Sequence, residues 1–506
     1  MQLRSPSPDV AYHPIDIVES STFGKSKDIN ASRTFNMIQS DDWIVNYSGY
    51  KKEIIISEIG QGRGIFTSSN SNSFISVIND SVYAISLYST GPSGHRTYST
   101  RKVGTISTIS GDVFIDENNA SQIAISDQVN LYIYNYATDT FQMAILPDGV
   151  VPGNVTFHNG RFVIPDKATN QWFLSAPNDG LNWFWGDTGA PVIGAIQTKP
   201  DKSRVTIRFP GRSDLLLVMG QNVSELQVDI GALIFPYQKN TSVSFDYGCL
   251  NAATVAASEE IIAWLGSNEK SEPVLMYTNG SDIKTISTDG INEILQSIVN
   301  PEKSSAFFVK VLGHLIYQLT FYDEKDNYSF IYDFTTGKFF DVTDQDMNYH
   351  IARRVALYQG EYYFVSLNDG CIYIMNSDIP VYNYGVDENN NPIEFEIPRI
   401  RVCSNFRLPN SKRFIVTNVS LTMQQGNDPN NIIPSLSYQP RISLSVSRDG
   451  GITFGSSSSI PLNPLGVTRN RVEWWKLGAA NNLVLQFRFH GKGQWNAFTG
   501  VMGVRQ

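Results

Sequence analysis

The chain has few cysteines, few charges and no long apolar run. Only three residues are cysteine, Cys249, Cys371 and Cys403, and they lie far apart. An odd, sparse set does not make a disulfide framework, so we expect assembly in a reducing cytoplasm. No stretch reaches the roughly 18 apolar residues that a membrane span needs. Residues 1–17 lack the apolar core of a signal peptide.

Charged residues of both signs are also scarce. Charged residues make up 17% of the chain, and 39 basic against 48 acidic residues leave a formal net charge of −9. Because nucleic-acid binding relies on neutralising phosphates, this balance argues against a protein that grips DNA or RNA. It is compatible with DNA sliding past a like-charged wall. Aromatic residues reach 12%, which favours pleated, half-buried β surfaces over helix bundles.

One hairpin pattern occurs twice in the same phase. Residues 134–141 (YNYATDTF) and 332–339 (YDFTTGKF) each combine an aromatic strand, an Asx residue, a Thr-rich turn and a second aromatic strand. The two copies start 198 residues apart. That offset is about four units of roughly 50 residues, the period of propeller blades. The alternative is two unrelated hairpins that share good turn chemistry.

Short strands and tight turns follow one another from Glu53 onward. Asn159-Gly160 is the strongest hairpin signal among them. Similar turns fall near Asp80, Gly220, Glu259, Gly313 and Gly360. The 280 residues from Asp80 to Gly360 span six intervals at about 47 residues per four-stranded blade. We therefore predict an all-β chain with a β-propeller of about six blades.

One segment has a helical period. Its apolar residues are spaced i, i+3, i+4, i+7 and i+8, and they are Ile291, Ile294, Leu295, Ile298 and Val299. Asp289 is the expected cap, and Asn300-Pro301 ends the segment. We predict one short helix inserted between blades.

Changes in composition and periodicity along the chain suggest three parts. Residues 1–40 are polar and lack periodicity, so we predict an N-terminal arm. We assign 41–385 to the propeller and 386–506 to a separate, sandwich-like C-terminal β domain for docking. Within the last part, Leu483, Leu485, Phe487 and Phe489 alternate with polar residues. This period of two indicates a sheet with one buried face.

A turn motif in the last part resembles an Asp-box, S-x-D-x-G-x-T-W, with Phe in place of Trp. Its residues are Ser447, Asp449, Gly451, Thr453 and Phe454. The carboxylate can accept backbone N–H bonds across the turn, and glycine permits a positive φ. Asp-boxes are common in sialidase-type propellers but lie away from their catalytic centres. A glycosidase also needs two placed carboxylates, which we do not find, so we assign the motif a structural role.

Other motifs give no catalytic, cofactor or metal site. Asp187-Thr188-Gly189-Ala190 spells the aspartic-protease tetrad, but that chemistry needs a second copy. The glycines of 60–64 are followed by a strand instead of the helix that a phosphate loop requires. Asp341, Asp344 and Asp346 lack the glycine and distal glutamate of a Ca²⁺ loop. The six histidines have no metal-ligand spacing.

Several short segments, taken in order, resemble the tail hub proteins of short-tailed bacteriophages, also called nozzle or packaged-DNA stabilisation proteins. The likeness extends over about 36–490. It is carried by Asn36-Met37, Ser48-Gly49-Tyr50, Arg63-Gly64, residues 217–220 with Ser224-Glu225, the Gly248 region, 261–265, 291–299, 446–450 and 472–476. The chain departs from this pattern in a longer N-terminal arm and in the length of 378–440.

The resemblance implies a structural virion protein with no catalytic residues and no cofactor. Such proteins form a homo-hexamer below the portal and its adaptor, the head-to-tail connector. Double-stranded DNA passes through the ring, a tail needle or tip closes it, and fibres or spikes attach to its side. The implied location is the virion tail, after assembly in the host cytoplasm.

Two other classes of function stay open. The Asp-box motivates a glycan-active propeller, either a sialidase-like hydrolase or a lectin. Alternatively, 386–506 is a carbohydrate-binding sandwich in which Trp474 or Trp475 stacks on sugar. Because neighbouring strand residues face opposite ways, at least one of the two tryptophans must be buried.

Overall fold

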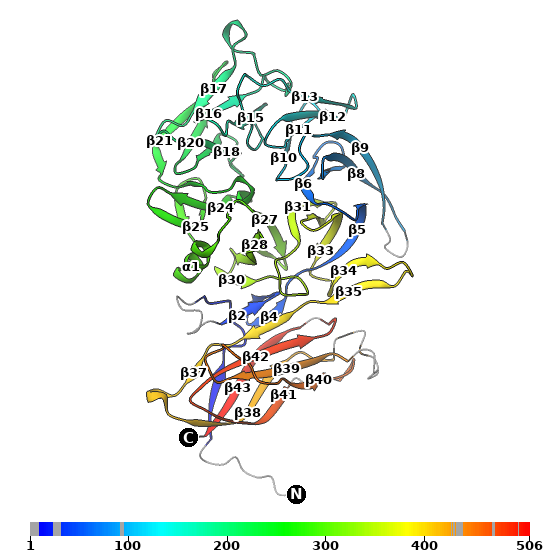
Figure 1. Ribbon diagram of the computed structural model, residues 1–506, viewed down its shortest axis with the longest axis vertical. Helices are drawn as coiled ribbons and strands as arrows, with labels where there is room; N and C mark the ends of the chain where they lie inside the picture. Colours follow the sequence, from blue (N-terminus) through cyan, green and yellow to red (C-terminus); the bar gives the residue numbers. More distant parts are fainter. Residues whose placement is uncertain are drawn as a thin grey trace.

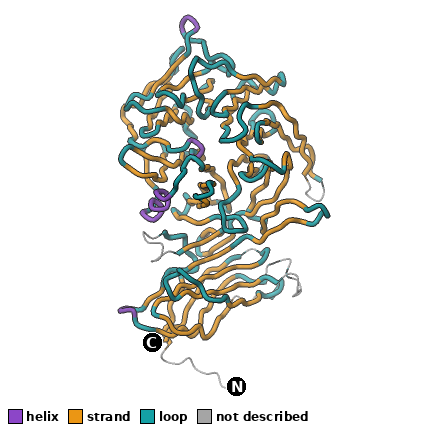
Figure 2. The backbone as a smooth tube through the Cα atoms, in the orientation of Figure 1, coloured by secondary structure: helices purple, strands orange, loops and turns teal. Residues whose placement is uncertain are grey.

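The computed structural model describes residues 10–23, 32–91, 96–426, 428, 431, 439–467, 471–493 and 495–505. Figure 1 shows a ring of small β-sheets at one end of the long axis and a smaller layered body at the other. Strands make up most of both parts (Figure 2). The all-β class expected from the composition is confirmed.

Seven sheets of the described chain form the ring, and most have four antiparallel strands in sequence order. Blades 1 to 3 are β6 (Gly62–Thr67), β7 (Phe74–Ile78), β8 (Ser81–Thr90) and β9 (Arg96–Thr105); β10 (Phe114–Glu117), β11 (Gln122–Ser126), β12 (Leu131–Asn135) and β13 (Thr140–Met143); and β14 (Thr156–His158), β15 (Arg161–Pro165), β16 (Gln171–Leu174) and β17 (Val192–Ala195). Blades 4 and 5 are β18 (Ser203–Arg208), β19 (Leu215–Gly220), β20 (Ser224–Asp229) and β21 (Tyr237–Phe245); and β22 (Gly248–Cys249), β23 (Ala256–Ser258), β24 (Ile261–Asn268), β25 (Ser271–Thr278) and β26 (Ile283–Thr285). Blades 6 and 7 contain β27 (Ser304–Val311), β28 (His314–Tyr322), β29 (Asn327–Asp333) and β30 (Lys338–Asp341); and β31 (Ala352–Tyr358), β32 (Glu361–Ser366) and β33 (Gly370–Asn376).

The ring therefore has seven blades, not about six. The turns near Asp80 and Gly360 are separated by six intervals, and six intervals separate seven units. Each gap between neighbouring blades holds its own cluster of buried apolar side chains, including the gap between blades 7 and 1. The core of the propeller is thus divided among seven blade-to-blade contacts.

An early strand closes the ring. β5 (Gly49–Ser57) is the fourth strand of blade 7, and it pairs antiparallel with β33 so that Gly49 lies opposite Asn376. The other edge of β5 pairs in parallel with β34 (Val381–Val386), whose antiparallel partner is β35 (Pro392–Glu396). Because strands from both ends of the propeller complete one sheet, the ring is held shut at this blade.

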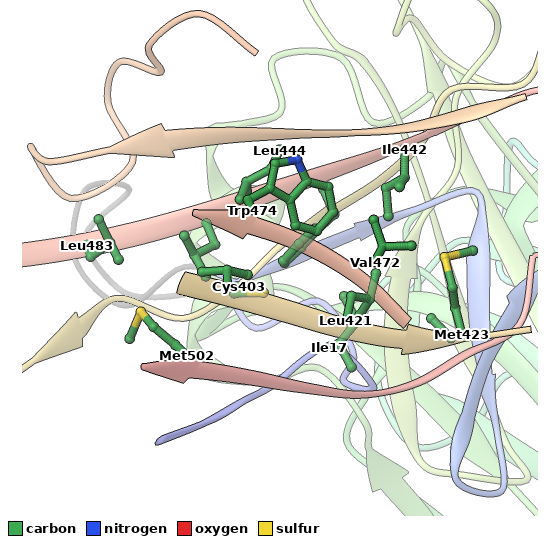
Figure 3. Packing of buried hydrophobic residues seen from close by; sticks show 14 of the residues in the cluster. Ile17, Cys403, Leu421, Met423, Ile442, Leu444, Val472, Trp474, Leu483 and Met502 are labelled. Atoms are coloured by element: carbon green, nitrogen blue, oxygen red, sulfur yellow. The ribbon is translucent and has the colours of Figure 1, made fainter. Parts of the chain in front are cut away.

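Two sheets facing each other form the second body. The first contains β1 (Val10–Ile15), β3 (Met37–Ser40), β4 (Trp43–Asn46), β43 (Ala497–Arg505), β38 (Phe414–Met423) and β41 (Arg471–Ala480). The second contains β36 (Arg399–Val402), β37 (Phe406–Arg407), β42 (Asn482–His490), β39 (Arg441–Ser447) and β40 (Ser458–Pro461). Figure 3 shows apolar side chains such as Leu421, Ile442 and Trp474 meeting between them. The four apolar residues Leu483, Leu485, Phe487 and Phe489 of β42 are buried, as its sequence pattern predicts, and Val484 between them is buried as well.

A three-residue strand joins the two bodies. β2 (Arg33–Phe35) pairs in parallel with β30 of blade 6 and antiparallel with β36 of the sandwich. Blade 6 and one sandwich sheet are therefore a single ten-stranded sheet. The described parts of residues 1–40 form strands in both bodies, where the sequence suggested an arm without periodic structure. The division at 40 and 385 stays a prediction.

The two repeated hairpins are present, as β12–β13 and β29–β30. Asn135 Oδ1 accepts the backbone N–H of Ala137 at 3.0 Å, and Asp333 Oδ1 accepts that of Thr335 at 2.9 Å. The Asx residue therefore builds the same turn in both copies. They belong to blades 2 and 6, four blades apart, in agreement with the spacing.

The predicted helix is also present, as α1 (Asp289–Ser297). Ile291 and Leu295 are its buried apolar residues. Its cap differs from the expectation: the Thr288 hydroxyl accepts the backbone N–H of Ile291, whereas Asp289 is the first residue of the helix. Threonine takes the capping position because its backbone is extended there. Three short 3-10 turns, η1 (Asp187–Gly189), η2 (Ala252–Thr254) and η3 (Pro409–Ser411), complete the described elements.

His350 makes the stability of the propeller depend on pH. Its ring is fully buried against the rings of Tyr50 and Phe364, and burial lowers its pKa to about 3. In the unfolded chain the pKa is about 6.5, so the unfolded state takes up a proton first as the pH falls. The neutral, buried His350 therefore contributes its full share of the unfolding free energy above about pH 6.5. This contribution is lost as the pH falls from about 6.5 toward 3.

We expect wild-type protein to lose about 2 to 3 kcal/mol of unfolding free energy through this group between pH 7 and pH 4.5. A His350→Phe variant keeps the ring packing but has no proton to take up. Urea unfolding of both proteins at the two pH values measures the difference. Parallel losses in the two proteins would contradict the assignment.

Candidate functional site: the junction between the two bodies

The N-terminal segment is held at the junction by a buried carboxylate. Asp341 at the end of β30 is fully buried and accepts four hydrogen bonds. Arg33 donates two of them, from Nε at 2.7 Å and from Nη2 at 2.5 Å, and the hydroxyls of Tyr328 and Ser21 donate the others. The guanidinium of Arg33 also lies over the ring of Phe23. A bidentate, charge-assisted pair of this kind fixes both distance and orientation.

A second arginine holds the same segment from the sandwich side. Arg401 of β36 is fully buried, and its Nε donates to the carbonyl oxygen of Asp16 at 2.9 Å. Its Nη1 donates to the carbonyl of Ser20 and to the hydroxyl of Thr34. The Asp16 carboxylate lies 3.1 Å from Nη2. The segment is thus bound by one charged group from each body.

Asn36 occupies the point where the segment turns from β2 into β3. It is fully buried with a φ of 55°, a left-handed conformation that asparagine tolerates. Its side chain donates to the carbonyl of Pro398 at 2.9 Å and accepts the backbone N–H of Thr343, also at 2.9 Å. One amide therefore bridges the propeller and the sandwich. Asn36-Met37 was among the segments that carried the family resemblance.

The hairpin β34–β35 adds ion pairs to the junction. Lys492 Nζ lies 2.5 Å from Glu394, and His490 Nδ1 lies 3.1 Å from Glu396. Arg399, fully buried at the start of β36, donates to the carbonyl of Pro380 at 3.0 Å. The two bodies therefore contact each other through side chains on both sides of β2.

Sequence reasoning gave no buried role to these arginines or to two more inside the ring, although Arg63-Gly64 was among the segments that carried the family resemblance. Arg63 is fully buried and donates to the carbonyl oxygens of Asn79, Thr108 and Gly111, which ties blade 1 to the loop before blade 2. Arg353 pairs with Asp112 at 3.0 Å. Nothing local in the sequence distinguishes them from surface arginines, because their partners lie on other blades.

The Asp-box-like residues form a surface turn after β39. The exposed Asp449 carboxylate accepts the backbone N–H of Ile452 and of Thr453 at 3.1 and 3.0 Å. Hydrogen bonds from Ser447 and Thr453 lower the pKa of Asp449. Gly451 has a φ of 103°, and Phe454 is half-buried. The turn uses the carboxylate for backbone hydrogen bonds.

The other motifs are scattered. Asp187 lies in an exposed turn, and the glycines of 60–64 lead into strand β6. Asp341 is committed to Arg33, while Asp344 accepts backbone N–H groups of its own loop. No cluster of three or more His, Cys, Asp or Glu residues suited to a metal occurs in the described chain. The three cysteines are free and buried.

No helix among the described residues is long and apolar enough to cross a membrane. Trp474 is 3% exposed and Trp475 is 62% exposed. One tryptophan of the pair is therefore buried and the other faces outward, as their alternation predicts.

Comparison with models of known protein families shows which family the chain belongs to. A model of the β-propeller of bacteriophage P22 Gp10 matches residues 36–314, and a model of the β-sandwich of the same protein matches residues 400–501. The chain belongs to the bacteriophage P22 Gp10 family. The resemblance to phage tail hub proteins and the fold class of a propeller with a C-terminal sandwich are confirmed. This Gp10-family chain is a structural protein of a phage tail.

Other comparisons add nothing to this assignment. A search of curated proteins gave no match. Similar solved structures include an extracellular domain of a one component system from B. thetaiotaomicron (10% identity, 71% of this chain, 51% of that chain, TM-score 0.41). They also include the virginiamycin B lyase of Staphylococcus aureus (10%, 65%, 99%, 0.41) and the N-terminal domain of Nup159 (12%, 68%, 99%, 0.39). These scores are low, and we draw no conclusion for the Gp10-family chain from them.

Proposed function

We propose that six copies of this chain form the tail hub of a short-tailed phage, below the portal and its adaptor. The ring retains packaged DNA, conducts it during ejection, and anchors the needle or tip and the fibres or spikes. It assembles in the host cytoplasm. The observation that carries the proposal is the family match in both bodies of one chain. The sheet continuous through β2 supports it, because a ring under pressure from packaged DNA needs stiff protomers.

The test is a phage that lacks this chain. Heads should fill and then leak, so purified particles should hold little nuclease-resistant DNA. Supplying the wild-type chain from a plasmid is the control and should restore retention. Stable, full heads in the absence of the chain would refute the retention role.

Ring formation has its own test. An acidic chain rich in aromatics suits a protomer that stays soluble until it meets its adaptor, since obligate interfaces bury more than about 2,000 Å². We expect a ring when the purified chain is mixed with the head-to-tail connector. Mass measurement with and without the connector detects it. A chain that stays monomeric with the connector would refute the proposal.

The net negative charge of the chain supports a role in the passage of DNA. Six copies at −9 each carry a formal charge of −54. A like-charged wall offers few partners to phosphates, so the genome slides with low friction. Lysine in place of lumen-facing acidic residues should slow ejection. Unchanged ejection rates would refute the sliding role alone; the alternative is that the negative charge lies mostly on the outer surface and serves solubility.

We also propose that the chain is not a hydrolase. Asp449 is occupied by its own turn, and Asp187 is exposed without a second aspartate beside it in the described turn. Asp449→Ala and Asp187→Ala should alter folding stability at most. Glycan- and peptide-cleavage assays on both variants check this, and loss of a measured cleavage at unchanged melting temperature would overturn it.

A further inference from the structure

One end of the propeller axis is a basic cavity. Its volume is about 640 Å³, and loops that enter or connect strands of all seven blades line it. The lining includes Gln61, Asp112, Gln128, Lys167, Lys202, Arg204, Gln221, Asn251, Glu302, Lys303 and Arg353. Five of these side chains are cationic and two are anionic, in a chain whose net charge is −9. Positive charge is therefore concentrated in this cavity, although the chain as a whole carries a net negative charge.

Several of these cations lack a carboxylate in hydrogen-bond contact. Lys167 donates to the amide oxygen of Gln128 at 3.1 Å, and Arg204 donates to the carbonyl of Leu250 at 2.9 Å. Lys303 does have a partner, Asp323, at 2.6 Å. Partial desolvation among the lining residues and the neighbouring Arg204 lower the pKa of Lys167, whose side chain is otherwise exposed, while Glu302 opposes the shift. The basic side chains thus crowd one another in the free protein.

Two adjacent arginines of β31 lie near the cavity, and one of them, Arg353, belongs to its lining. A β-bulge in β31 interrupts the register between Ala352 and Arg354. Arg353 pairs with Asp112. Arg354 Nη1 donates to the carbonyl of Ala306 at 3.3 Å, and its guanidinium lies 5.2 Å from the ring centre of Phe114. Its Nη2 is buried without a hydrogen-bond partner in the described protein. Arg354 is not in the cavity lining, so it adds positive charge to this region without itself being placed to contact a ligand there.

An apolar hollow adjoins the basic cavity. It shares Gln61 and Ser110 with the cavity, and the rest of its lining is Ile59, Gly60, Asn79, Asp80, Ile109 and Leu367. Ile59 is 84% exposed and Ile109 is 71% exposed. Exposed isoleucines beside a cluster of cations fit a ligand that carries both apolar groups and negative charges. Neither an inorganic anion nor a nucleic-acid backbone has this combination.

We propose that this end of the propeller binds an acidic peptide segment with an apolar side chain next to its carboxylates. The carboxylates bind among Lys167, Lys202 and Arg204, and the apolar side chain packs on Ile59 and Ile109. The partner is a protein segment and not DNA, because the exposed Ile59 and Ile109 contact an apolar side chain and the Asp80 carboxylate in the same hollow repels phosphates. This inference depends on the geometry of one protomer, so it can fail while the hexameric ring forms, and the reverse.

The test is fluorescence anisotropy with a labelled peptide of four glutamates followed by leucine. We expect the wild-type protein to bind it, and to bind the matching glutamine peptide at least about tenfold more weakly. A Lys167→Gln/Lys202→Gln variant should lose the preference. A Lys284→Gln/Lys412→Gln variant removes two exposed lysines elsewhere and should behave like wild type. An Ile59→Ser/Ile109→Ser variant should weaken binding of the leucine peptide but not of four glutamates alone.

Three outcomes would overturn the proposal. One is equal binding of the glutamate and glutamine peptides. Another is an equal loss of glutamate-peptide binding in the two lysine variants, which would mean that the peptide binds through general electrostatic attraction to the protein surface. The third is tighter binding of a single-stranded oligothymidylate than of the peptide, with inorganic phosphate competing, which would make the cavity a phosphate site. All four substituted lysines and isoleucines in the cavity variants are exposed, and unchanged melting temperatures confirm their folding.

Discussion

An Asp341→Ala variant should unfold at a clearly lower urea concentration than the wild type. The change removes the acceptor of four hydrogen bonds and leaves Arg33, whose side chain is 26% exposed, without its carboxylate. Removing one partner of a largely buried pair costs about 3 to 5 kcal/mol. Because Asp341 anchors the N-terminal segment, limited proteolysis should also cut that segment sooner.

The matched control is Asp214→Ala. Asp214 pairs with Arg212, and both side chains are about half exposed, so this change should leave the unfolding midpoint where it is. A double variant, Arg33→Met with Asp341→Leu, removes both charges and should recover part of the loss. A loss under about 1 kcal/mol in Asp341→Ala would show that the pair does not hold the junction.

A Gly49→Ala variant should damage the closing strand of the ring. A Cβ at Gly49 would lie 2.3 Å from the carbonyl oxygen of Ile379 and 2.6 Å from that of Val381. Both obstacles are backbone atoms next to β34, so β5 and β34 must move apart. We expect a loss of about 3 kcal/mol and faster amide exchange in β33 and β5.

Gly455→Ala is its control. A Cβ there meets only the Val446 carbonyl oxygen, at 3.6 Å, and the residue is exposed. Such a change in a permissive backbone is neutral or stabilises by a few tenths of a kcal/mol. Unfolding curves and hydrogen exchange of the two variants show whether the loss of stability is specific to Gly49. Equal curves for both would mean that β5 tolerates a side chain at this position.

Local patterns predicted the parts that depend on near neighbours. The helix around Ile291 has a period of 3.6 residues, and the alternation in β42 has a period of two, because each element buries one face. The repeated hairpins follow from turn chemistry at Asn135 and Asp333. These signals lie within a few residues of the structures they specify.

The junction had no such signal. β2 is three residues long, too short for a period, and Arg33 meets its partner 308 positions away. Arg401 and Asp16 are separated by 385 positions. The sequence identified an unpatterned segment, whereas contacts with two distant strands give it structure. The order of the family segments was informative where periodicity was not, since Asn36 and Arg63 both proved to be buried linking residues.

The pairing of early strands with late ones has a consequence for biosynthesis. β5 cannot find its place in blade 7 until β33 has left the ribosome, and β1 pairs with β43, with Val10 opposite Arg505. Blade 7 is complete only after β33 has emerged, and the first sandwich sheet only after β43 has emerged; contacts this distant in sequence form slowly. A chain released early would lack the strand between β38 and β4. Completion of the sandwich therefore depends on synthesis having reached β43 (Ala497–Arg505), so a chain shortened before this strand should be recognisable by an unfolded sandwich.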